Sequence, residues 1–204
     1  MPSTEEIRVW DPFVRVFHWS LVVLFAIAYL TGDEESRLHI WIGYAILALL
    51  AARIVWGFVG TRHARFRDFV FPPRVILGYA LAMVTMRARR YLGHNPLGGA
   101  MVVTLLVCLS LTGITGYLLL PGEASSPDQI AAATLAPIAM ARANGRDEHN
   151  RDDDGLLKEL HEALADLTVI LVLLHIAGVL ASSLVHRENL VRSMITGRKR
   201  AGPD

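Results

Sequence analysis

Cysteine is almost absent from this chain of 204 residues, in which Cys108 is the single example. One thiol cannot form a disulfide within the chain, and without a Cys-x-x-Cys-His sequence the covalent attachment of a c-type haem is excluded. Cys108 lies inside an apolar run, where a small packing role is expected. Any haem would therefore be held by axial ligands and non-covalent contacts alone.

Charge is also scarce: 19% of the residues are charged and 53% are hydrophobic, with a mean hydropathy of +0.40. Apolar runs over about 12–30, 38–59, 97–120 and 163–185 approach the roughly 20 residues that a spanning helix needs. Lipid cannot satisfy unpaired backbone groups, so each run is predicted to be a helix. The predicted fold class is an all-α integral membrane protein, with a four-transmembrane-helix bundle as the single domain over residues 1–204.

Positive charge gathers between the second and third runs, where one acid, Asp68, stands among seven arginines and the difference is 7 − 1 = +6. The C-terminal tail is basic too, whereas the turn "GDEESR" and the segment 121–160 are acidic. The positive-inside rule then predicts a bacterial inner (cell) membrane protein, multi-pass, with both termini cytoplasmic and 121–160 as a long periplasmic loop. No Ala-x-Ala type cleavage site accompanies the first run, so we expect the first helix to be retained. The arginines of the basic loop are Arg62, Arg65, Arg67, Arg74, Arg87, Arg89 and Arg90.

A shorter apolar segment, "FPPRVILGYALAMVTM" at about 71–86, follows a Pro-Pro pair. It is short for a span and is predicted to be a cytoplasmic interfacial helix. The alternative, a fifth span, would place the basic tail on the wrong side of the membrane.

Four of the eight histidines stand at span positions: His18, His39, His161 and His175. The last two are 175 − 161 = 14 residues apart, which returns to within roughly 40° of the same helix face after a rise of about 21 Å. The alternating direction of the spans then pairs His39 with His161 (the outer pair) and His18 with His175 (the inner pair, on the side of the basic loop). Two imidazoles from facing helices are what a six-coordinate b-type haem needs, so two haem b groups are predicted.

Two arginines are candidate partners for haem propionates. Arg53 follows His39 by 53 − 39 = 14 residues and so shares its face at the level of the inner pair, while Arg15 lies one turn before His18. A buried arginine requires an anion. The alternative for Arg53 is that it extends to lipid phosphates. The remaining histidines are interpreted as interface residues: His63, His94, His149 and His186. Of these, His94 is the reserve ligand if His18 does not bind the haem.

Several motifs at these positions are similar to those of the bacterial cytochrome b561 family, which includes the b-type cytochrome subunits of nickel-iron hydrogenases. The motifs are "RVWDPFVRVFHW", "LHIWIGY", "LTGITGYLL", and "LHE" followed by "LLHIAG", and the resemblance covers nearly the whole chain. It implies a four-helix diheme protein that moves electrons between the quinone pool and a partner. The family's ligands, on spans one, two and four, fall on the four histidines already paired by spacing.

The sequence thus predicts a diheme b-type cytochrome that carries electrons across the inner membrane between quinone and a periplasmic c-type cytochrome or hydrogenase-like protein. The quinone site is expected near the inner haem. One alternative is a stand-alone superoxide or small-reductant:quinone oxidoreductase. Another is a histidine-containing ion transporter, although Glu162 and Asp166 are the only acids near the start of the fourth span. Membrane lipid is an expected partner and a homodimer is allowed, whereas no nucleic acid is expected.

Overall fold

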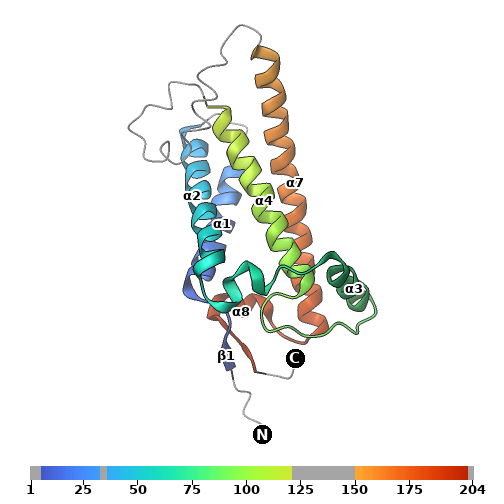
Figure 1. Cartoon of the computed structure of the whole chain (residues 1–204). Helices are drawn as coiled ribbons and strands as arrows, with labels where there is room; N and C mark the ends of the chain where they lie inside the picture. Colours follow the sequence, from blue (N-terminus) through green and yellow to red (C-terminus); the bar gives the residue numbers. More distant parts are fainter. Residues whose placement is uncertain (1–5, 33–35, 121–149, 202–204) are drawn as a thin grey trace.

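Four long helices form the body of the computed structural model, which describes residues 6–32, 36–120 and 150–201 (Figure 1). They are α1 (Pro12–Leu30), α2 (Arg37–Val59), α4 (Pro96–Leu118) and α7 (Asn150–Val185). All four have spans long and apolar enough to cross a membrane. The predicted fold class is therefore confirmed.

Capping residues fix where three of these helices begin. The side chain of Asp11 caps α1, that of Ser36 caps α2 and that of Asn95 caps α4, each by accepting a hydrogen bond from a backbone N–H in the first turn. Pro12 occupies the start of α1, where its missing N–H costs nothing. Ser36 accepts from the N–H of His39 itself, at 3.2 Å, so the cap directly sets the position of a candidate ligand.

The helices pack as two pairs, α1 along α2 and α4 along α7, with α2 also touching α4. The buried core between α1, α2 and α4 is apolar. Large apolar side chains stay exposed on the outward faces, for example Leu30 on α1, Phe58 on α2 and Leu184 on α7. Such faces are expected where lipid is the solvent. The core residues are Phe17, Ile42, Ile46, Leu50, Leu106 and Leu109.

Helix α7 starts earlier than the sequence predicted. It begins at Asn150, so residues 150–160, which were assigned to the long outer loop, are helical. The spacing of Leu156, Leu160 and Leu164 continues one apolar stripe through this segment, which explains the extension. The rest of the predicted loop, 121–149, lies outside the described residues.

Shorter elements gather at the end where α1 begins. The predicted interfacial segment contains α3 (Pro73–Val84), which packs beside α4 and exposes Leu77, Leu81 and Val84. Two 3-10 turns, η1 (Arg62–Ala64) and η2 (Phe66–Asp68), precede it. Helix α8 (Leu190–Thr196) and an antiparallel pair, β1 (Glu6–Arg8) with β2 (Arg198–Arg200), were not predicted. Together these elements close the basic end of the bundle (Figure 1).

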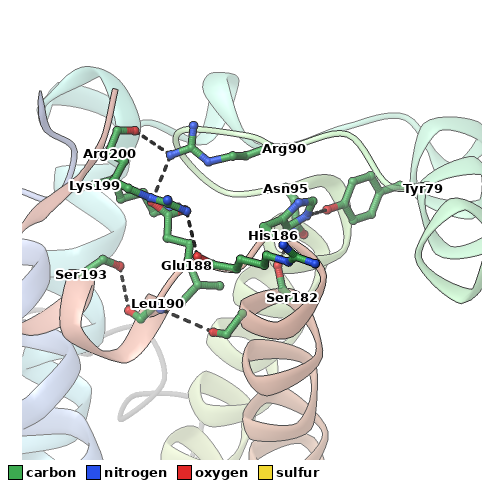
Figure 2. Close-up of polar contacts among 12 residues, drawn as sticks. Tyr79, Arg90, Asn95, Ser182, His186, Glu188, Leu190, Ser193, Lys199 and Arg200 are labelled. Atoms are coloured by element: carbon green, nitrogen blue, oxygen red, sulfur yellow. Dashed lines mark hydrogen bonds and ion pairs between the residues drawn. The ribbon is translucent and has the colours of Figure 1, made fainter. Parts of the chain in front are cut away.

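A buried ionic cluster ties the C-terminal tail to the basic loop, as Figure 2 shows. Glu188 lies 3.0 Å from a guanidinium nitrogen of Arg90 and 4.0 Å from the Lys199 ammonium, and the Arg90 guanidinium also donates to the Arg200 carbonyl at 2.6 Å. Burial alone would raise the pKa of Glu188, but the hydrogen bond from Arg90 and the two cations lower it overall. Glu188 therefore stays ionised and holds two chain segments together.

Candidate haem sites

The outer pair joins α2 to α7. The imidazole centroids of His39 and His161 lie 6.2 Å apart with the rings at 82°. His39 Nδ1 is 3.0 Å from the Ala28 carbonyl and His161 Nδ1 is 2.9 Å from the Thr112 carbonyl. Because a carbonyl only accepts, both Nδ1 atoms must carry the proton, which leaves each Nε2 with a free lone pair for a metal.

Helix α4 supplies the room for His161. A Cβ placed on Gly116 would stand 2.8 Å from His161 Cε1, closer than ordinary contact, so the imidazole occupies the space that glycine leaves open. Thr115, on the same turn, places its hydroxyl 3.1 Å from His161 Nδ1. Gly116 belongs to the "LTGITGYLL" motif, but its contact with His161 was not predicted from the sequence.

The inner pair joins α1 to α7. The centroids of His18 and His175 lie 6.4 Å apart with the rings at 54°. Trp19 packs edge-on against His18 at 5.1 Å. His18 Nδ1 is buried and has no hydrogen-bond partner among the described residues. The structure thus brings together both histidine pairs expected from the sequence.

Both separations suit a metal held between two imidazoles. Two nitrogen–metal bonds of about 2 Å, with about 1 Å more from each nitrogen to its ring centre, put the centroids about 6 Å apart. In the described part of the chain no three His, Cys, Asp or Glu side chains gather as a metal cluster. Two imidazoles, with no further side-chain donor gathered around them in the described residues, would suit a metal whose remaining ligands come from a macrocycle, so the donor set fits haem.

The inner end also contains buried nitrogens that lack acceptors. Arg53, 2% exposed, donates from Nη2 to the Ala64 carbonyl at 3.2 Å, but its Nη1 has no partner within the described residues. Its guanidinium carbon lies 5.5 Å from the centroid of the Phe66 ring. The other unpartnered nitrogens belong to basic side chains at this end, so an anion fits there. They are Arg15 Nε, His18 Nδ1, Arg90 Nε and His94 Nδ1.

His94 is enclosed rather than at an interface. Its ring lies 4.7 Å from those of Trp10 and Phe69. Burial, reinforced by the charges of Arg53 and Lys199, lowers the pKa of His94 to about 3, so the ring is neutral. The sequence predicted an interface position for His94. The helix cap that follows it, Asn95, is a sequence feature that fixes where His94 lies, and it was not used in that prediction.

His186 and His63 belong to neither pair. His186 Nε2 lies 3.2 Å from the Tyr79 hydroxyl in the cluster of Figure 2. The pKa of His63 is lowered by burial and by Arg62. His149 lies outside the described residues.

Arg15 contacts α8. Its Nη2 donates to the Ile195 carbonyl of α8, and the side chain lines a groove of about 440 Å³ between α1 and α8. The groove is lined by Pro12, Arg15, Val16, Trp19, Ser20 and Ile195.

Comparison with known proteins places this arrangement in a family. The sequence is 25% identical over 95% of the chain to a "Probable Ni/Fe-hydrogenase B-type cytochrome subunit" of Bradyrhizobium diazoefficiens, covering 85% of that protein. A protein of the same name from Rhodobacter capsulatus is 24% identical over 95% of the chain and 81% of its own length. No solved structure matches the chain. The sequence model of the prokaryotic cytochrome b561 family matches residues 9–197. The chain therefore belongs to the prokaryotic cytochrome b561 family, and it is a haem-binding electron-transport protein whose described residues include four helices able to span a membrane.

Proposed function

We propose that this protein is a diheme cytochrome that carries electrons across the inner membrane between the quinone pool and a periplasmic redox protein. The observation that supports this most directly is that two histidine pairs share one face of α7. The ring centroids are 6.2 Å apart in the outer pair and 6.4 Å apart in the inner pair. The 14-residue spacing separates their levels by about 21 Å along the helix. One haem in each half of the membrane would connect the two surfaces.

Each proposed site has its own set of side chains. His39 and His161 hold the outer haem b, with Nδ1 of each fixed by a carbonyl. His18 and His175 hold the inner one, and the unpartnered Nη1 of Arg53 is proposed to donate to a propionate. The same role for Arg15 stays a prediction. Bound haem b supplies reversible one-electron chemistry, whose potential depends on axial ligands, burial and nearby charge.

The partners follow from sidedness and from the relatives. The basic end is proposed to be cytoplasmic and to take electrons from, or give them to, a membrane quinone. The opposite end is proposed to meet a periplasmic c-type cytochrome or a hydrogenase-like protein, because the relatives are named as hydrogenase cytochrome subunits.

Vectorial electron transfer tests the proposal. The purified protein is reconstituted in liposomes that enclose ferricyanide, and a short-chain quinol is added outside. We expect ferricyanide reduction that depends on the protein, that is lost in His39→Ala and His175→Ala, and that persists in His63→Ala, a histidine outside both pairs. Reduction that survives removal of either pair would contradict a route through two haems.

Two further assays separate the alternatives. Quinone reduction by superoxide without any protein partner would favour the stand-alone oxidoreductase. Ion movement in liposomes that contain no quinol would favour the transporter.

A further inference from the structure

The groove between α1 and α8 lies on the outer face of α1. Pro12, Val16, Trp19 and Ser20 follow one another at helical spacing and share one face, whereas His18 points roughly 140° away from the centre of that face. Val16 is 66% exposed and Trp19 is 39% exposed. The groove therefore opens toward the surroundings of the bundle, not toward the histidine pairs.

Positive charge lies beside the groove without a matching acid. Arg15 makes no ion pair with any described residue, and its buried Nε has no acceptor. The carboxylate of Asp11, at the start of the same helix, is already engaged by the Val14 N–H at 2.9 Å, by the Trp56 indole at 3.1 Å and by the Thr61 hydroxyl at 2.6 Å. No acid among the described residues pairs with Arg15, so an anion from outside the chain fits at this position.

The rest of the groove is suited to an amphipathic molecule. Val16 and Ile195 form apolar walls, and Trp19 is the residue type that prefers the membrane interface. The hydroxyl of Ser20 makes no hydrogen bond to the part of the chain that the structure describes, so it is free for an ester carbonyl. Arg192, about one turn before Ile195 on α8, is exposed and adds positive charge to this helix.

We propose that this groove binds one anionic phospholipid, with its phosphate accepting hydrogen bonds from Arg15 and its acyl chain lying along Val16 and Trp19. Anionic headgroups are drawn to basic groups at the membrane surface. A neutral quinone would leave the guanidinium uncompensated, and free phosphate would leave the apolar walls uncovered. The assignment gives Arg15 to a lipid in place of a haem propionate. Trp19 contacts His18, so the lipid lies one side chain away from the inner pair.

Lipid retention tests this assignment. The haem-loaded full chain is purified in mild detergent, phosphatidylglycerol is titrated in, and bound lipid is counted by native mass spectrometry. We expect one tightly held phosphatidylglycerol. Arg15→Gln should weaken its binding at least about fivefold, the effect of losing one cation at an anionic surface. Val16→Trp, which fills the groove and keeps Arg15, should weaken it as well without loss of haem.

The matched control is Arg67→Gln, which removes an exposed arginine of the same basic end without touching the groove. It should bind lipid as the parent does, and added inorganic phosphate should not displace the lipid. Equal retention by the parent, Arg15→Gln and Val16→Trp would overturn the proposal. A quinone found in place of the phospholipid would also overturn it. Loss of the inner haem in Arg15→Gln, together with normal lipid binding by Val16→Trp, would also overturn it and would indicate that Arg15 binds a haem propionate.

Discussion

Gly116→Ala tests how closely α4 controls the outer haem site. The added Cβ would stand 2.8 Å from His161 Cε1 and 3.3 Å from Nδ1, where ordinary contacts begin at 3.4 Å. The ring must therefore retreat by 3.4 − 2.8 = 0.6 Å. Metal sites tolerate errors of only about 0.2 Å in ligand distance, so the outer site should lose haem while the inner site keeps it.

Two measurements distinguish a local effect from a general one. Pyridine haemochrome analysis should show a fall from two haems per chain toward one, and a redox titration should lose one component. Gly178→Ala is the control, because nothing lies within 4 Å of its added Cβ. Two haems with unchanged potentials in Gly116→Ala would refute the contact-based reasoning.

Three other changes probe the remaining parts of the structure. His175→Ala should remove the inner haem alone, and full occupancy of both sites in haem analysis would show that the pairing is wrong. Arg53→Gln should lower the midpoint potential of the inner haem by about 60 mV, a tenfold change in equilibrium, because a lost positive charge disfavours the reduced form; an unchanged potentiometric titration would remove Arg53 from the site. Glu188→Gln should cost about 3–5 kcal/mol by leaving Lys199 buried and unpaired, whereas Glu6→Gln, in an exposed pair at 3.7 Å, should cost less than about 1 kcal/mol. Acid should act on the parent as Glu188→Gln does, because a carboxylate whose pKa is lowered by folding contributes stability that is lost as the pH falls. Thermal unfolding in detergent measures both effects. Equal losses of stability in Glu188→Gln and Glu6→Gln would contradict the first expectation, and a parent whose stability does not fall in acid would contradict the second.

The spans and the histidine pairs could be predicted because both depend on local rules. Apolar length predicts a spanning helix, and the 14-residue interval between His161 and His175 fixes two levels on one face. The alternating direction of the spans then leaves one arrangement for His18 and His39. The ring separations in the structure agree with that arrangement.

Contacts between distant segments could not be predicted. Glu188 is one acid in a basic tail by sequence, and its partner Arg90 is 98 residues away. The fit of Gly116 to His161 depends on the register of α4 against α7, which no single-helix pattern encodes. Strand β2 forms only because α8 returns the chain to β1, so its three residues carry no periodic signal.

Haem content tests the central claim most directly. Pyridine haemochrome quantitation on the purified chain, together with a reduced-minus-oxidised absorption spectrum, gives the number and the ligation of the haems. The account predicts two b haems per chain, both six-coordinate with two histidines. A single haem would show that one pair is misassigned, and a chain folded in haem-replete cells that contains none would contradict the account.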